Sequence, residues 1–159
     1  MTQTQLVLSK TQLATLGSDL SQLGRQHGVR FAILGDLSGQ DIAFWDALGD
    51  SDIASIAALA AGDLMATLEL GRMLGGERAC NLIVQEHDEQ TVLIARVGQS
   101  LFLLLATARD VPLGWSRLAI KRAVERIVKI VGPMADTPPP PAVTDDFESK
   151  FAAQLNTIW

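Results

Sequence analysis

The sequence has 159 residues, enough for one domain and a tail. Hydrophobic residues make up 48% and charged residues 19%, a balance typical of a globular protein, and the net charge of −5 argues against a protein that wraps nucleic acid. The single cysteine, Cys80, excludes an internal disulfide and a multi-cysteine metal site, which fits a reducing compartment.

The sequence shows no sign of export or membrane insertion. Residues 1–5 are polar and uncharged, unlike the basic and then apolar start of a signal peptide. The longest apolar stretch, residues 101–106, is far shorter than the roughly 20 residues that a bilayer-spanning helix needs. We therefore expect a cytoplasmic protein without integral membrane association.

The first part of the chain predicts a helix followed by a β-hairpin. Leucines at steps of three and four indicate an amphipathic helix over residues 10–27. Residues 29–34 and 41–45 are typical of strands. Between them, Asp36 and Gly39 suit the first and fourth positions of a β-turn.

The second part predicts a long helix, three strands and a further helix. The long helix is expected from a cap at Asp50, Ser51 or Asp52 to about residue 74. Short polar connections join strands at residues 81–86, 91–97 and 100–107, which predicts antiparallel pairing. A helix from residue 112 to about residue 131 follows.

A tail follows the last of these helices. The four prolines at residues 138–141 predict a stiff, extended linker. Beyond them, residues 145–157 predict a short amphipathic helix. Its apolar stripe and the aromatic residue after it are Phe147, Phe151, Leu155, Ile158 and Trp159.

The predicted fold class is α/β, more strictly α+β, with elements in the order α-β-β-α-β-β-β-α. A five-stranded antiparallel sheet with helices on its faces satisfies this order. The predicted organisation is a domain over residues 1–135, a proline-rich linker over 136–144 and an amphipathic helix over 145–159.

Three segments stand out within this order: the strand–turn–strand at residues 32–43, the alanine-rich helix at residues 56–64 and the strand pair within residues 82–98. In their order and spacing they resemble the Roadblock/dynein light chain (LC7) superfamily. Within the superfamily, the sequence is similar to the bacterial co-regulators of a small Ras-like GTPase that sets polarity in gliding motility.

The resemblance implies a homodimer that pairs through the second helix and the third strand into one continuous sheet. It also implies a regulator that can stimulate GTP hydrolysis by repositioning the residues of the GTPase, without donating an arginine. The tail lies outside the part of the chain that resembles the family.

No residue pattern predicts catalysis, a cofactor or a metal site. The two histidines, His27 and His87, fall in a helix end and a turn, with no recognisable arrangement with Cys80 or a serine. The glycine-rich residues 71–76 end a helix instead of following a strand and opening one, so they do not fit a phosphate loop. We expect a protein that is not an enzyme.

The second helix predicts a dimer interface. Away from its apolar stripe it carries small side chains and few charges, which allows a second helix to approach closely. The alternative is that alanine is used only as a good helix former. The predicted interface consists of Ala54, Ala58, Ala61, Gly62 and Met65.

Two further surfaces are candidates for binding. The last helix concentrates positive charge, which either docks an acidic partner or a headgroup surface, or pairs with the protein's own acids. This basic face consists of Arg117, Lys121, Arg122, Arg126 and Lys129. The apolar stripe of the tail is expected to dock on this domain, on a dimer mate or on another partner, or to order only when bound.

The function that these observations predict is a homodimeric, non-catalytic adaptor that binds and regulates or scaffolds a small GTPase. One alternative is a scaffold unrelated to GTPases. Another is a small-molecule sensor of the PAS or GAF type, which would need an enclosed pocket with a few convergent polar groups.

Overall fold

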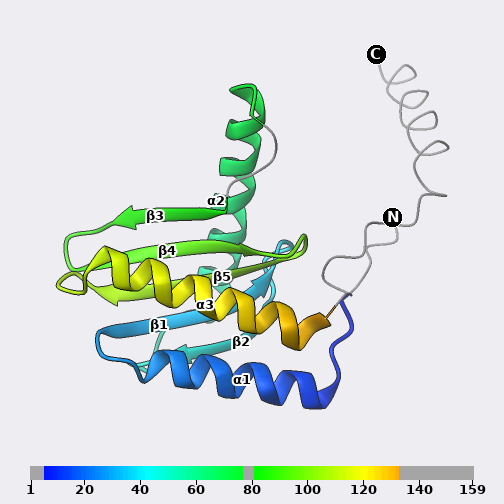
Figure 1. Cartoon of the computed structure of the whole chain (residues 1–159), viewed down its shortest axis with the longest axis vertical. Helices are drawn as coiled ribbons and strands as arrows, with labels where there is room; N and C mark the ends of the chain where they lie inside the picture. The colour runs from blue at the N-terminus through cyan, green and yellow to red at the C-terminus, as the bar shows by residue number, and fades with distance from the viewer. Residues whose placement is uncertain (1–5, 77–80, 133–159) are drawn as a thin grey trace, which may run out of the picture.

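A computed structural model describes residues 6–76 and 81–132. Three helices and five strands follow the predicted order (Figure 1). They are α1 (Lys10–Gly24), β1 (Val29–Asp36), β2 (Asp41–Asp46), α2 (Ile53–Met73), β3 (Leu82–Glu86), β4 (Gln90–Val97), β5 (Leu101–Ala108) and α3 (Leu113–Val131). The predicted linker and tail helix lie outside the described residues.

The strands form one antiparallel sheet in the order β2-β1-β5-β4-β3, so the predicted fold class is confirmed. β1 and β5 pair in the middle although β2, α2, β3 and β4 lie between them in the chain, while β2 and β3 form the two edges. The hairpin turn is also as predicted, because the Gly39 amide donates to the Asp36 carbonyl at 3.0 Å. Asp36 Oδ1 accepts further hydrogen bonds from Ser38 and Gln40.

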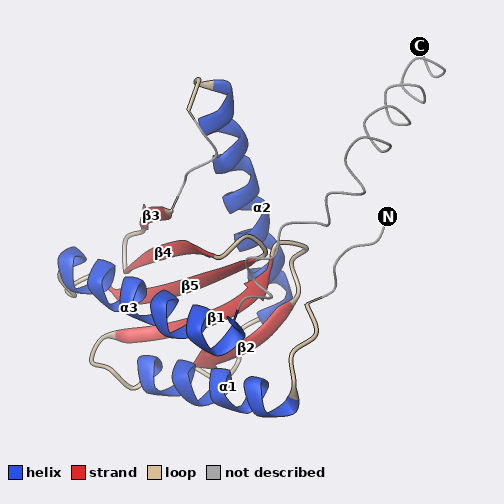
Figure 2. Cartoon of the chain, turned by 45° about the vertical axis from the view of Figure 1, so that its right-hand side comes forward, coloured by secondary structure: helices blue, strands red, loops and turns tan. Residues whose placement is uncertain are grey.

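Helices cover both faces of the sheet. α1 and α3 lie side by side on one face, and α2 lies on the other, with its C-terminal part projecting beyond the strands (Figures 1 and 2). Alternate residues of the strands supply two separate cores. Leu103 and Leu105 point into the core under α1 and α3, whereas Phe102 and Leu104 point into the core under α2.

The predicted end of the first helix, residue 27, is wrong. α1 ends at Gly24, where the Arg25 amide donates to the carbonyls of Ser21 and Leu23. The Gln26 amide also turns back to Leu23 at 3.2 Å, so the last turn tightens before the chain enters β1. Gly28, with φ 82°, then takes the left-handed conformation that reverses the chain.

Of the three residues predicted as possible caps of α2, Asp52 is the N-cap in the structure. The Ser55 hydroxyl and backbone amide both donate to its carboxylate, at 2.6 and 3.2 Å. Both hydrogen bonds lower the pKa of Asp52 below its ordinary value, and the bond from the Ser55 hydroxyl has the larger effect. A charged cap therefore faces the positive end of the helix dipole at neutral pH.

A close approach between α1 and β2 generates the first prediction. A Cβ at Gly24 would overlap the indole ring of Trp45, whereas a Cβ at Gly17, in the middle of the same helix, meets no atom within 4 Å. We expect Gly24→Ala to lower the free energy of unfolding by about 1–3 kcal/mol through overpacking. The control Gly17→Ala should raise it by about 0.5–1 kcal/mol because glycine is a poor helix former. Urea denaturation measures both, and equal effects would contradict the packing.

An ion pair between α1 and α3 generates the second prediction. Arg126 Nε lies 2.8 Å from Asp19 Oδ1, and the Asp19 side chain is only 10% exposed. Its other oxygen, Oδ2, is buried and has no hydrogen-bond partner in the described part of the chain. We expect Arg126→Met to destabilise the fold by about 1–3 kcal/mol because a buried carboxylate loses its donor.

The matched control is Arg122→Met on the same helix. Arg122 is exposed and forms no ion pair with a described residue, so this change should stay within about 0.5 kcal/mol of the parent. A loss in the control equal to that in Arg126→Met would show that the ion pair is not the cause.

Candidate interaction surfaces

The outward face of α2 is apolar and exposed. The buried face of the helix rests on the sheet through small and medium side chains, Ala57, Ala60, Ala61, Leu64 and Leu68. The opposite side carries apolar side chains that are at least 48% exposed. They are Leu59, Met65, Leu70 and Met73, with Leu74 directly after the helix. The helix therefore has two apolar sides, of which residues 6–76 and 81–132 cover one.

The structure separates the five residues predicted for the dimer interface. Ala54, Ala58, Gly62 and Met65 are exposed, and a Cβ at Gly62 would meet no atom within 4 Å. Ala61 is 3% exposed and packs in the chain's own core under α2, so its side chain is not on this surface. Sequence spacing placed Ala61 beside Gly62, but the two residues fall on different sides of the helix.

The interface prediction overlooked the larger side chains of α2. Leu59, Leu70 and Met73 are exposed by 74%, 57% and 72%. A helical wheel drawn against the buried residues would have found them, because they recur at the spacing of one face with Ala66. Because these side chains are large, the exposed side of α2 forms a hydrophobic patch and not only a stripe of small residues.

The composition of α2 also meets the length and hydropathy of a membrane span, with a mean hydropathy of 1.6. The expectation based on residues 101–106 missed this helix because a few polar residues interrupt it. In the structure, 28% of that window is buried in the protein, and Asp63 accepts a hydrogen bond from Gln85 of β3. Near its end, Arg72 is 2.5 Å from Glu69, which raises the pKa of the arginine.

β3 is a short edge strand next to α2. Its five residues pair with β4 on one side only, in register from Leu82↔Ala95 to Glu86↔Thr91. The opposite edge of an antiparallel strand presents backbone N–H and C=O groups that a further strand can pair with. Ile83 and Gln85 face the α2 side of the sheet, where Gln85 is joined to Asp63.

The basic face of α3 lies on the other side of the sheet. Arg117, Lys121, Arg122 and Lys129 are exposed, and within residues 6–76 and 81–132 none of these four forms an ion pair. Arg126 pairs with Asp19. One of the two interpretations of this face was that its basic residues pair with the protein's own acids. Among the described residues, this holds for Arg126 alone.

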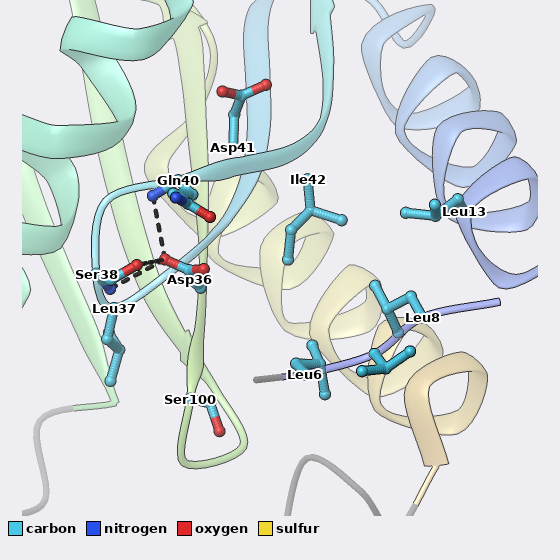
Figure 3. Close-up of a pocket in the computed structure, with 11 residues that line it drawn as sticks. Leu6, Leu8, Leu13, Asp36, Leu37, Ser38, Gln40, Asp41, Ile42 and Ser100 are labelled. Atoms are coloured by element: carbon cyan, nitrogen blue, oxygen red, sulfur yellow. Dashed lines mark hydrogen bonds between the residues drawn. The ribbon is translucent and has the colours of Figure 1, made fainter. Parts of the chain in front are cut away.

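A groove of about 840 Å³ lies between the N-terminal segment and the β1–β2 turn (Figure 3). Leu6, Leu8 and Ile42 line one side, and the Asp36 turn lies opposite, with its carboxylate already bonded to Ser38 and Gln40. The groove is open to solvent, and Leu6, Leu8 and Ile42 in its lining also pack against the edge of the core under α1 and α3. It therefore differs from the enclosed pocket that the sensor alternative requires.

The histidines are apart in the structure. His27 follows α1, and His87 lies between β3 and β4, both exposed. His27 lines a second open hollow of about 420 Å³ with Val111, Pro112 and Trp115. The described residues contain no cluster of three or more His, Cys, Asp or Glu side chains that could hold a metal ion. Cys80 lies outside the described residues.

Solved structures share this fold. MglB of Myxococcus xanthus is 22% identical, with a TM-score of 0.74 over 84% of this chain and 99% of that one. The gliding protein MglB of Thermus thermophilus is 28% identical, with a TM-score of 0.72 over 80% and 96%. An MglB with a tetrameric arrangement is 27% identical, with a TM-score of 0.74 over 82% and 97%.

Comparison with curated proteins finds no match. The Roadblock/LC7 domain family, however, matches residues 15–107, more than half of the chain, and this segment runs from α1 to the end of β5. With the MglB structures as neighbours, the resemblance expected from the sequence is confirmed. The chain belongs to the Roadblock/LC7 domain family and is of the MglB-like type.

Proposed function

We propose that this protein is a homodimeric, non-catalytic adaptor that binds and regulates or scaffolds a small Ras-like GTPase. The observation that carries the proposal is the exposed apolar face of α2, which begins beside the core and continues beyond the sheet. The similarity to MglB structures that are 27% and 28% identical supports the same assignment.

Self-association would cover this face. Leu59, Met65 and Leu70 present apolar area whose transfer from water is favourable by about 25 cal/mol per Å². The β3 edge lies on the same side of the molecule, so pairing of two copies would join two sheets and bring two α2 helices together. Asp63 and the Glu69–Arg72 pair make burial in a protein interface more favourable than burial in lipid.

The dimer proposal predicts the effect of charge on α2. Leu59→Glu with Met65→Glu places two carboxylates on the exposed side without touching the core, since these side chains are 74% and 48% exposed. Loss of two buried apolar side chains, at about 1.5–3 kcal/mol each, should weaken dimerisation about 100-fold or more. Sedimentation velocity at micromolar concentration measures the shift to monomer.

The control for this experiment is Ala14→Glu, at an exposed position of α1 on the opposite face of the sheet. It should remain a dimer. Circular dichroism of both variants checks that the fold persists. A double variant that stays dimeric, or a parent protein that is monomeric at this concentration, would place the interface elsewhere.

The GTPase proposal predicts a change in a partner's hydrolysis. The parent protein should bind a nucleotide-loaded Ras-like GTPase of the same cell and alter its single-turnover rate, and Leu59→Glu with Met65→Glu should remove the effect. Arg72→Ala should keep it, because the regulator is proposed to reposition residues of the GTPase and not to insert an arginine of its own. Binding without any change in rate would favour a passive scaffold, and absence of binding would refute the GTPase role.

A further inference from the structure

The charges of this protein are separated between the two sides of its sheet. α3 carries five basic residues and one acidic residue, whereas the whole chain has a net charge of −5. From Asp36 to Asp63, which spans the hairpin turn, β2 and the first half of α2, the sequence has six aspartates and no lysine or arginine. The α3 side is therefore the positive side of an acidic molecule.

We propose that the basic face of α3 is the docking site of the chain's own C-terminal segment, residues 145–159. This segment begins with Asp145, Asp146 and Glu148 and has one lysine, Lys150. Its charge is opposite to that of α3 and equal in sign to that of the α2 side. Charge complementarity thus selects one face of the sheet for the tail.

The length of the intervening chain allows this docking. α3 ends at Val131, and the Ile130 carbonyl accepts a hydrogen bond from Gln12 of α1 at 3.2 Å, so the chain leaves the domain beside the basic face. Residues 133–144 span about 37 Å if extended like polyproline. The length of α3 from Val131 back to Trp115 is about 24 Å. The segment therefore reaches every part of the helix.

The order of charged and apolar groups along α3 is the reverse of that along the tail. Leu113 and Leu118, which are 36% and 45% exposed, lie toward the start of α3 on either side of Arg117, near the hollow lined by Val111, Pro112 and Trp115, and Lys121, Arg122 and Lys129 follow them. In the tail, Leu155, Ile158 and Trp159 follow the acidic residues.

An antiparallel arrangement matches both parts. About 11 residues, or about 16 Å of helix, separate Lys129 from Leu118, and a similar length separates Asp145 from Leu155. The acidic end of the tail then lies by Lys129 and Arg122 while its apolar end lies by Leu118.

The tether makes this contact favourable even if each charge pair is weak. The four prolines stiffen the middle of the connection, and the residues on either side of them allow it to bend back toward α3. A tether of this length gives an effective concentration in the millimolar range, whereas a separate acidic partner must compete from solution. Exposed pairs contribute little individually and are screened by salt, so the docked state should be sensitive to ionic strength. The face is then a site that a stronger anionic ligand uncovers by displacing the tail.

Paramagnetic relaxation in the full-length protein tests this proposal. A spin label at Ser149→Cys, in a Cys80→Ser background, avoids the apolar stripe because Ser149 lies on the other side of a helix from Phe147 and Phe151. We expect loss of amide signals within residues 117–129 and no loss on the exposed face of α2. The signals should recover at high salt.

Charge reversal identifies the contacts. Lys121→Glu with Arg122→Glu should restore the α3 signals, and adding Asp145→Lys with Asp146→Lys to that protein should abolish them again. The control Arg30→Glu, an exposed base on β1, should leave the pattern unchanged. Loss of signal confined to another surface, or none at all, would overturn the proposal.

Two further arms separate the other occupants of this face. Mixing spin-labelled protein with isotope-labelled protein that carries no spin label reports contact between copies. Broadening of the α3 signals of the copies without a spin label would overturn docking within one chain. Sedimentation with phosphatidylserine vesicles tests a lipid surface. Binding of the full-length protein that depends on Lys121 and Arg122 and is unaffected by removal of residues 142–159 would assign the face to membranes and also overturn the proposal.

Discussion

The packing of α2 on the sheet is the constraint on which the other surfaces depend. The small side chains Ala57, Ala60 and Ala61 let the helix lie close to β1 and β5. Only a narrow strip of the helix surface is buried, and most of that surface faces away from the sheet. The same face also buries the larger side chains Leu64 and Leu68. Leu59, Leu70 and Met73 lie on the other side of the helix, where no residue of the described part of the chain buries them. The proposed partner contacts therefore depend on this uncovered side.

The sheet keeps two kinds of surface apart. The exposed apolar side chains of α2 lie on one face, whereas the exposed basic side chains of α3 lie on the other, beside the smaller exposed apolar groups Leu113 and Leu118. The layer of strands between α2 and α3 allows the two surfaces to contact different groups.

Much of the fold could be predicted because local signals agreed with the tertiary structure. The Asp36 turn and the order of elements depend on short-range chemistry that the sequence states directly. The end of α1 was placed three residues too late because Gly28 is the first strong stop signal in the sequence, whereas the Arg25 and Gln26 amides already turn back to Ser21 and Leu23. The strand order also escaped local reasoning, since β1 pairs with β5 across the whole of α2.

The surfaces were predicted less well than the fold. Ala61 was predicted to lie on the exposed side of α2. Small residues occur on both the buried and the exposed side of this helix, so residue type alone does not tell the two sides apart. The basic residues of α3 were found from the sequence, but whether they pair with internal acids required the position of Asp19. Leu59 and Leu70 were missed because the interface was predicted mainly from the small residues of the helix.

The overhang of α2 has a consequence for local stability. The last buried residue of the helix is Leu68, and in the turn from Glu69 to Met73 Arg72 pairs with Glu69. A turn without a buried residue frays at a small free-energy cost, and a helix that packed on it would suppress the fraying.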